Sequence, residues 1–258
     1  KNNIQVYQCQ SNLGSALSRY PELIKQFWKI RHKVQLIYVG FFGHLDMPLA
    51  WTLAKLTGKR VVFDMFYSMY DTYVFDRKST SPHSLRAQIY IFFDKLAGEL
   101  ADLIITDTRT HANYFIRRFR LRPKKFRRLF VGGDDTIFRP TQKKRKKKIF
   151  VEFHGYFTRL HGAEYYVEAA KLLENEKNIR FIFMGTTSNY AEPLKRYKAL
   201  KPRTMTYIPE VPPAKLSNII ANADISIGHL GETNKARSVI TNKIFQALAC
   251  KTAVIVGD

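Results

Sequence analysis

The sequence has few cysteines and no long apolar run. Only Cys9 and Cys250 occur among 258 residues, too few and too far apart for a disulfide framework, so a reducing cytoplasmic compartment is expected. No apolar stretch reaches the roughly 18 residues that a membrane-spanning helix needs. The composition, 45% hydrophobic and 25% charged, excludes a disordered or fibrous chain and suits a core that needs no structural metal.

Two further features are missing at the ends of the chain. The first residue is Lys1 rather than Met, and no signal peptide follows it. The last residues, 253–256, have the pattern of a strand. We therefore expect a chain that is truncated at both ends.

Acidic residues are scarce. The chain has 43 Lys and Arg against 21 Asp and Glu, a formal net charge of +22, with local peaks at residues 117–128 and 143–148. Such a surface attracts polyanions, which include nucleic acid, acidic lipids and phosphorylated substrates. Because no nucleic-acid-binding motif is recognisable, a nucleic-acid partner is not expected.

Aromatic and basic residues alternate in one of these peaks. Phe115, Phe119 and Leu121 have arginines around them, a pattern that predicts contact with an anionic membrane surface. The alternative places these apolar side chains in the core and the arginines in water. The basic residues proposed to face the membrane are Arg117, Arg118, Arg120, Arg122, Lys124 and Lys125.

Short β-branched runs alternate with longer helical stretches along the whole chain. This pattern predicts mostly parallel sheets with helices on both faces. A break after Pro140 and the basic run 143–148, which is expected to be a linker, divide the chain into two Rossmann-like domains, 1–140 and 141–258. Strands are expected at 4–9, 34–39, 61–66, 103–106, 128–131, 149–153, 181–184, 225–227 and 253–256, and helices at 16–30, 49–56, 82–100, 111–119, 163–173, 213–221 and 242–250.

The loop after the strand at 149–153 favours phosphate binding. It carries Gly155 and Gly162, and a helix is expected to start immediately after it. A helix start offers unpaired N–H groups and a positive dipole end, and glycine lets a phosphate approach the backbone. Arg159 and His161 could add charge-assisted hydrogen bonds. The alternative is an ordinary strand-to-helix turn.

The helix expected at 242–250 carries a second polar group. Asn242, Lys243 and Gln246 have the spacing to share a polar face at its start, which suits a diphosphate and a ribose. The alternative is a solvated face on a core helix. The residues expected to face inward are Ile244, Phe245 and Leu248.

These segments resemble the family 4 glycosyltransferases, which have the two-domain GT-B fold. Gly155 and Gly162 keep the spacing of the family's Gly-Arg-x-x-x-x-Lys-Gly loop. Residues 243–257 resemble its K-x-x-E-A-x-A-x-G-x-P-V-V stretch, and residues 131–140 are similar to the P-x-G-V-D-x-x-x-F-x-P exit from the acceptor domain.

The chain also departs from the family pattern. The loop arginine and lysine fall on Tyr156 and His161, and the paired glutamates fall on Ser238 and Gln246. The family's acceptor-domain histidine after the strand at 61–66 is missing. The first strand and glycine-rich loop of the acceptor domain and the C-terminal return helix are absent as well.

The resemblance implies two domains facing each other across a cleft, and transfer of a hexose from a nucleoside diphosphate sugar to a saccharide or lipid-linked acceptor, with retention of configuration, for a surface polysaccharide or glycolipid. Cationic groups would offset the charge that develops on the leaving diphosphate. It implies no cofactor, and no metal-ligand spacing is recognised; the expected location is the cytoplasm, either free or on the inner face of the membrane. The implied catalytic residues are Asp64, Arg159 and Lys243; the donor-binding residues are Gly155, His161, Gly162, Glu232, Asn242 and Gln246; the acceptor-binding residues are His44 and Asp71.

Two other functions remain open. The departures at Ser238 and Gln246 are compatible with a non-catalytic GT-B-like protein that binds a polyanion or a membrane surface. A Rossmann-type dehydrogenase ranks last, because no strand leads into Gly-x-Gly-x-x-Gly followed by an acidic residue about 20 positions later.

Overall fold

A computed structural model describes residues 4–142, 147–187 and 190–257. The chain forms two compact units; the first ends at Leu129, and the second begins at Phe130 and also includes Tyr73–Ser79. The sequence predicted this boundary at 140. The segment before 140 packs with the second unit instead, because Phe138 lies in a core cluster with Ile220 and the Ser217 hydroxyl donates to the Ile137 carbonyl. Within the predicted linker, residues 143–146 lie outside the described residues.

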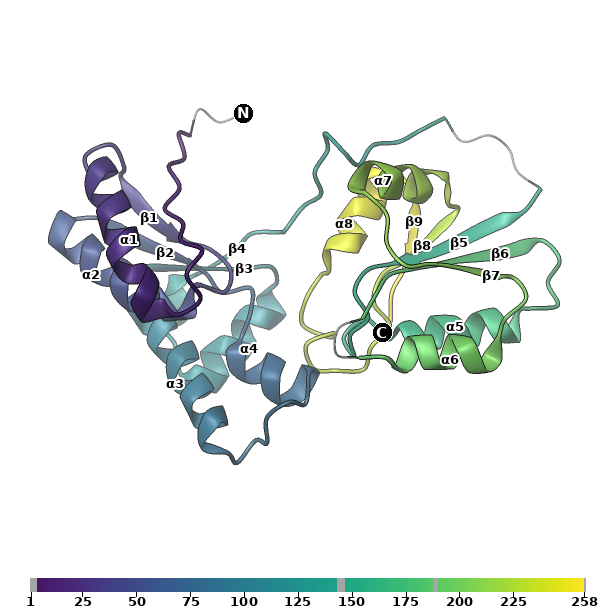
Figure 1. Ribbon diagram of the computed structural model, residues 1–258, viewed down its shortest axis with the longest axis horizontal. Helices are drawn as coiled ribbons and strands as arrows, with labels where there is room; N and C mark the ends of the chain where they lie inside the picture. The colour runs from purple at the N-terminus through teal and green to yellow at the C-terminus, as the bar shows by residue number, and fades with distance from the viewer. Residues whose placement is uncertain (1–3, 143–146, 188–189, 258) are drawn as a thin grey trace. The chain divides into compact units, whose positions relative to one another are not determined.

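The first unit contains a four-stranded parallel sheet whose strands follow chain order, β1-β2-β3-β4 (Figure 1). Ser84 and Thr108 cap the helices α3 and α4 by accepting hydrogen bonds from the N–H groups of Ala87 and His111. The elements are α1 (Ala16–Ile30), β1 (Leu36–Val39), η1 (Gly43–Leu45), α2 (Met47–Thr57), β2 (Arg60–Asp64), α3 (Leu85–Leu100), β3 (Leu103–Thr106), α4 (Arg109–Phe119), η3 (Pro123–Lys125) and β4 (Phe126–Arg128). The π-helical turn η2 (Asp71–Asp76) begins in this unit, but its residues from Tyr73 onward belong to the second unit.

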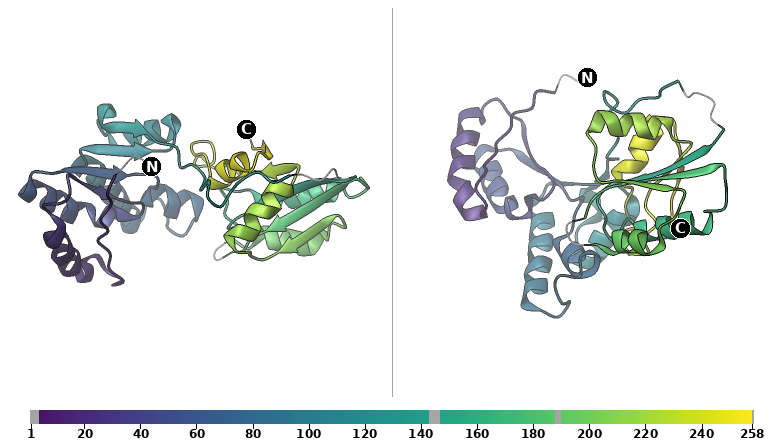
Figure 2. Two further views of the ribbon diagram at one scale, coloured as in Figure 1. Left: turned by 90° about the horizontal axis from the view of Figure 1, so that it is seen from above. Right: turned by 45° about the vertical axis from the view of Figure 1, so that its right-hand side comes forward.

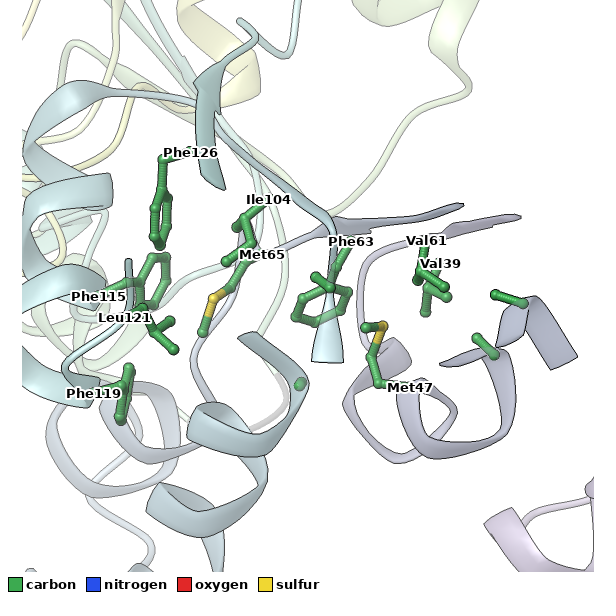
Figure 3. Packing of buried hydrophobic residues seen from close by; sticks show 14 residues of the cluster. Val39, Met47, Val61, Phe63, Met65, Ile104, Phe115, Phe119, Leu121 and Phe126 are labelled. Atoms are coloured by element: carbon green, nitrogen blue, oxygen red, sulfur yellow. The ribbon is translucent and has the colours of Figure 1, made fainter. Parts of the chain in front are cut away.

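The core of the first unit lies on one face of this sheet. Alternate strand residues such as Val61 and Phe63 are fully buried there, against side chains of α2, α3 and α4 (Figure 3). Phe115, Phe119 and Leu121 belong to this core and are at most 4% exposed. The prediction that these three side chains contact a membrane is therefore wrong, because they supply the apolar surface that covers β3 and β4.

Other predictions for this unit also need correction. No strand forms over the described residues 4–9, where Ile4 and Val6 are about three-quarters exposed, at 77% and 75%. The strand predicted at 128–131 is β4, and it is displaced toward the N-terminus, where Phe126 is buried against α4.

The second unit contains a five-stranded parallel sheet in the order β7-β6-β5-β8-β9. The helices α5 and α6 cover one face and α7 and α8 the other (Figure 1). Two of its elements, α6 and β7, were not anticipated by the sequence analysis. The elements are β5 (Ile149–His154), α5 (Ala163–Leu172), β6 (Ile179–Met184), α6 (Glu192–Leu200), β7 (Met205–Ile208), α7 (Pro213–Asn222), β8 (Ile225–Ile227), α8 (Asn242–Ala249) and β9 (Ala253–Ile255).

The strand order of this sheet reverses beside β5. Chain order runs outward from β5 through β6 to β7 on one side, and through β8 to β9 on the other. In open parallel sheets, ligands bind in the crevice outside the carboxyl ends of the strands at such a reversal. Figure 2 shows the two helical layers that flank this sheet. In the ranges that the structure describes, no helix has the length and apolar character needed to cross a bilayer.

Candidate functional site

Two glycines shape the loop at the carboxyl end of β5. Gly155 has φ +130° and Gly162 has φ +57°, conformations that side chains with a Cβ disfavour. A Cβ on Gly155 would lie 3.2 Å from the Nζ of Lys243, and one on Gly162 would lie 2.6 Å from the backbone N of Gly231. Glycine at both positions therefore lets this loop approach α8 and the loop after β8 closely.

Lys243 is the most unusual residue of the site. It lies in the first turn of α8, it is only 4% exposed, and its Nζ stands 4.0 Å from the centre of the Phe153 ring. Among the described residues, this Nζ has no hydrogen-bond partner. Burial lowers the pKa of Lys243 to about 7, and the charge of Glu152 only partly opposes this shift. A buried ammonium group without a partner is costly, and an anion that reached it would relieve that cost.

The orientation of α8 differs from the predicted one. Lys243 and Ala247 are its buried residues, whereas Leu248, which was expected to face inward, is 58% exposed. The small side chains of Ala247 and Cys250 pack in one cluster with Ile220 of α7, and Lys243 shares their face because it is four residues before Ala247. Lys243 is therefore turned into the protein rather than into water.

Two helices begin at this site without a side-chain cap. Gly162 precedes α5 and Thr241 precedes α8, and neither residue makes a capping hydrogen bond through its side chain. The first N–H groups of a helix carry partial positive charge. Together with the ammonium group of Lys243, they concentrate positive charge at this end of the sheet, which is the arrangement that favours an anion.

A series of buried, hydrogen-bonded polar side chains extends from the centre of the sheet to the start of α8. Glu152 is fully buried and accepts hydrogen bonds from the Ser226 hydroxyl and from Nδ1 of His154, the latter at 3.0 Å. The Nε2 of His154 lies 2.9 Å from the Oε1 of Gln246. Since Oε1 can only accept, this contact is a hydrogen bond when Nε2 carries a proton, and it directs the amide NH₂ of Gln246 away from His154.

Sequence reasoning missed the first members of this chain. Glu152 and His154 were not selected, although they alternate with Val151 and Phe153 in a strand expected to be buried. An acidic residue in the middle of a buried strand was the available signal, because carboxylates are almost never fully buried without partners. Gln246, which was predicted, is brought to the site by α8.

Two other histidines lie near Lys243. Nδ1 of His161 donates to the carbonyl of Tyr156, while burial, and then the charge of Lys243, hold the pKa of His161 well below its usual range. Burial and the same lysine lower the pKa of His229. His161 therefore offers an uncharged ring, not the charge-assisted hydrogen bond that the sequence suggested.

The predicted catalytic residue Arg159 and the remaining predicted donor residues, Glu232 and Asn242, lie at the surface of the second unit. The guanidinium of Arg159 stacks on the Tyr190 ring, with 4.8 Å from its carbon to the ring centre, and the Tyr190 hydroxyl donates to Glu164 at 2.5 Å. Glu232 and Asn242 are exposed. The structure thus brings Gly155, Gly162, Lys243 and Gln246 together at the carboxyl end of β5. Arg159 lies apart from them, stacked on the Tyr190 ring.

The predicted catalytic residue Asp64 and the predicted acceptor residues His44 and Asp71 belong to the first unit. Asp64, at the end of β2, accepts a hydrogen bond of 2.7 Å from the Tyr38 hydroxyl. His44 is buried in η1, and its Nε2 lies 3.2 Å from the Oδ1 of the fully buried Asp94. Asp71 is buried at the start of η2. Within the described ranges, no three His, Cys, Asp or Glu residues gather as metal ligands.

Comparison with solved structures identifies the fold. The chain superposes on sucrose-phosphate synthase from Thermosynechococcus elongatus with a TM-score of 0.66 and 17% identity, covering 93% of this chain and 60% of that one. It superposes on Anabaena HepE in complex with UDP-glucose with a TM-score of 0.64 and 14% identity, covering 98% and 66%. The fold is that of the GT-B glycosyltransferases.

A glycosyltransferase from Rickettsia africae gives a TM-score of 0.60 at 12% identity, covering 98% of this chain and 65% of that one. The chain thus spans less than two thirds of the length of these GT-B structures. No family model matches the sequence, and no curated protein matches it. The predicted two Rossmann-like sheets and GT-B architecture are confirmed, whereas membership of family 4, truncation and a cleft between the domains stay predictions.

Proposed function

We propose that the second unit binds a nucleoside diphosphate sugar and that the protein transfers its sugar to an acceptor. The observation that carries this proposal is the buried ammonium group of Lys243 at the start of α8, which has no hydrogen-bond partner in the described part of the chain and lies where the strand order reverses. A diphosphate at this position would receive the Lys243 charge and the first N–H groups of the helix. Support comes from the GT-B relatives, since HepE structures hold UDP-glucose, UDP, and UDP with glucose.

Each residue of the site has a place in this proposal. Gly155 and Gly162 allow the diphosphate to approach the backbone, and the Gln246 amide binds a ribose hydroxyl. A groove of about 630 Å³ beside α8, lined by Ile244 and Val256 among others, suits the flat face of a nucleobase. The sugar hydroxyls and the outer phosphate are assigned to Arg159, His161, Glu232 and Asn242.

The proposed reaction is a transfer with retention of configuration. The bond between the anomeric carbon and the diphosphate oxygen breaks, and the acceptor oxygen bonds to the same face of that carbon. The acceptor proton passes to the leaving phosphate oxygen, so no strongly basic side chain is required. Lys243 and Arg159 lower the barrier by stabilising the negative charge on the diphosphate as it departs.

The acceptor is proposed to contact the first unit through His44 and Asp71, and Asp64 is proposed as the catalytic residue that positions the acceptor or the donor sugar. A saccharide or a lipid-linked saccharide offers the hydroxyl groups that these side chains can bind. The proposed product is a surface polysaccharide or glycolipid made by a hexosyltransferase in the cytoplasm, with the nucleotide sugar as substrate and no cofactor.

Calorimetry with a panel of nucleotide sugars tests the donor site. We expect Lys243→Met to weaken binding of the preferred nucleotide sugar at least ~100-fold, because a charge-assisted contact of about 3 kcal/mol is lost. Lys215→Met, which removes an exposed lysine of α7, serves as the matched control and should bind normally. Equal affinity of both variants would contradict the proposed site.

A non-catalytic GT-B-like protein is the second candidate. The exposed arginines of α4 and the loop after it favour binding of a polyanion. Sugar release from the bound nucleotide sugar, measured with and without saccharide acceptors, separates the two functions. Tight nucleotide binding without any release or transfer would favour the non-catalytic protein.

A further inference from the structure

Aromatic side chains gather in the first unit where β1 and β2 end. Phe41 follows the last residue of β1 by two positions, and Phe66 follows the last residue of β2 by two positions. The ring centre of Phe41 lies 4.0 Å from that of Phe42 and 5.7 Å from that of Phe66. The buried ring of Tyr67 lies 4.7 Å from that of Phe42, whereas Phe41 and Phe42 are 46% and 55% exposed. We call this exposed pair, Phe41 and Phe42, the ring platform.

The turn that carries the ring platform holds a phenylalanine in a conformation that favours glycine. The Gly43 N–H donates to the Gly40 carbonyl at 3.0 Å, and Phe42, the third residue of this turn, has φ +71° and ψ 2°. These angles belong to a type II turn, whose third position is usually glycine. Because the Phe42 side chain is largely exposed, burial does not offset the strain. An exposed ring that is kept in a strained backbone position indicates a binding role.

Packing holds this turn in place. A Cβ on Gly43 would lie 2.3 Å from the Cγ1 of Val39, so the turn approaches β1 more closely than a residue with a side chain would allow. Tyr67 connects the ring platform to the interior, because its ring centre lies 5.7 Å from that of the buried His44. His44 in turn stands edge-on to Phe63 at 5.0 Å. The platform is therefore ordered before a ligand arrives, which lowers the entropic cost of binding.

A hydrogen-bonding pair lies at the same end of the sheet. The Tyr38 hydroxyl donates to the Oδ2 of Asp64, the last residue of β2, at 2.7 Å. Two segments, 34–54 and 61–76, supply this pair and the aromatic rings, and neither contains a Lys or an Arg, although the chain has 43 of them. A phosphorylated or acidic ligand would meet a carboxylate here and no cation from either segment. These residues therefore favour an uncharged ligand that carries hydroxyl groups.

We propose that the ring platform binds the apolar face of an uncharged pyranose ring of the acceptor, an inference that rests on the proposed function above. One face of a β-glucopyranose ring presents only C–H bonds, whose small positive charge is attracted to the negative face of an aromatic ring. The hydroxyl groups at the edge of the sugar ring can donate to the Asp64 carboxylate. An acyl chain would cover the rings but offer Asp64 no hydrogen bond, so it fits the site less well. The acceptor is thereby narrowed to a saccharide with a neutral ring at its reacting end.

Saturation-transfer NMR of the full chain with methyl β-D-glucopyranoside, without nucleotide, tests the proposal. The strongest saturation should fall on the protons of the sugar face that lacks hydroxyl groups. Phe42→Gly should weaken binding at least ~5-fold, because a stacked ring is lost, while its Tm should equal or exceed that of the wild type, because the strain is relieved. Phe41→Leu should weaken binding about threefold. Phe92→Leu removes a ring of α3 that is 59% exposed, and as the matched control it should bind the glucoside as the wild type does.

Unchanged glucoside binding in Phe42→Gly would overturn the proposal, as would a wild type that binds neither this glucoside nor methyl β-D-galactopyranoside. Methyl β-D-glucuronide carries a carboxylate on the same ring and should show no binding that depends on Phe42. An equal loss of glucuronide and glucoside binding in Phe42→Gly would overturn the preference for an uncharged ring. A wild-type dimer that Phe42→Gly converts to a monomer in sedimentation velocity would assign the rings to self-association instead.

Two further measurements separate this proposal from the proposed function. Calorimetry should give the same nucleotide-sugar affinity for Phe41→Leu, Phe42→Gly and the wild type, since the ring platform belongs to the first unit. Sugar transfer that is insensitive to both substitutions would overturn the ring platform and leave the proposed function standing. Glucoside binding that depends on Phe42, in a protein that transfers no sugar from any nucleotide sugar, would overturn the proposed function and support the platform as a saccharide-binding surface.

Discussion

Two buried charged side chains, Asp94 of the first unit and Lys243 of the second, differ in how completely hydrogen bonds satisfy them. In the first, the buried Asp94 accepts hydrogen bonds from the Ser68 hydroxyl and from the N–H groups of Met69 and Tyr70, and His44 lies beside it. In the second, the ammonium of Lys243 is buried without a hydrogen-bond partner in the part of the chain that the structure describes. A satisfied buried charge supports a fold, whereas an unsatisfied one is retained at a cost and indicates a ligand.

The largest expected effects come from removing these two charges separately. Lys243→Met should raise the stability of the second unit by about 2 kcal/mol at pH 7, since a buried lysine with a lowered pKa destabilises the fold. Asp94→Asn should destabilise the first unit by about 3 kcal/mol, because hydrogen bonds to a charged acceptor are lost. Thermal unfolding checks both, and opposite signs are the expected result. A destabilised Lys243→Met variant would show that Lys243 is structural.

The pH dependence of stability sharpens this difference. The pKa of Lys243 is about 7 in the folded protein, whereas the ordinary lysine value, which applies to the unfolded chain, is 10.5. Between these values the unfolded chain binds the additional proton, so the contribution of Lys243 to stability rises with pH from 7 to 10.5. Denaturant titrations should show this rise in the wild type and a flatter profile in Lys243→Met.

Two glycines with similar backbone angles give the next comparison. Gly58, after α2 in the first unit, has φ +66° and open space around a Cβ, whereas Gly162 has φ +57° and the backbone of Gly231 within 2.6 Å. Gly58→Ala should cost only the conformational strain of about 1 kcal/mol. Gly162→Ala should cost about 3 kcal/mol, because the backbone after β8 must also move, and it should weaken nucleotide binding. Denaturant titration of each variant measures both losses, and equal values would show that the close approach is dispensable.

Nucleotide binding itself should depend on pH. A bound diphosphate favours charged Lys243, so the affinity should be constant below pH 7 and fall about tenfold per pH unit above it, until the pKa of the complex is reached. Calorimetry at pH 8 in buffers of different ionisation enthalpy should detect proton uptake on binding. Absence of proton uptake would separate Lys243 from the diphosphate.

Much of the fold could be predicted from the sequence. The bounds of α1, β3 and β8 agree with those expected, because their apolar periodicity and flanking residues are clear. The segment 4–9 failed because β-branched residues indicate a strand without indicating its partner. α6 was missed because Lys and Arg interrupt the apolar period of residues 192–201, and β7 because its strand is only four residues long.

The candidate site could be predicted only in part. The positions of Gly155, Gly162, Lys243 and Gln246 at the ends of expected strands and helices were enough to predict that the site lies in the loops of the second unit. The inward turn of Lys243 could not be foreseen, because it depends on Ala247 and Cys250 packing against α7. The role of His154 could not be predicted either, because its hydrogen-bond partner Gln246 is 92 residues later in the sequence and only the fold brings the two together.

Removing the charge of Glu152, the buried carboxylate behind His154 and Gln246, should weaken nucleotide binding moderately. Glu152→Gln keeps the shape of the side chain but removes the charge that faces Nδ1 of His154. We expect an affinity loss of about tenfold, because the Gln246 amide is then less firmly oriented. Imidazole nitrogen NMR gives a readout that a merely structural role would not move, since it reports the hydrogen bonds that the two ring nitrogens of His154 make to Glu152 and Gln246. An unchanged spectrum in Glu152→Gln would exclude this positioning role.

The smallest expected effect on donor affinity comes from substitutions of Tyr190, whose ring stacks under the Arg159 guanidinium. Tyr190→Phe keeps the ring under the guanidinium and removes only the hydrogen bond to Glu164, so donor affinity should change less than about twofold. Tyr190→Leu removes the ring and should weaken donor binding about fivefold, in line with a cation–π contact of about 1 kcal/mol. In the first unit, Arg118 lies 4.6 Å from the Tyr70 ring centre in a similar stack. Tyr70→Leu should leave donor affinity unchanged, because that arginine belongs to the unit without the diphosphate site; an equal loss in both leucine variants would contradict the assignment of Arg159.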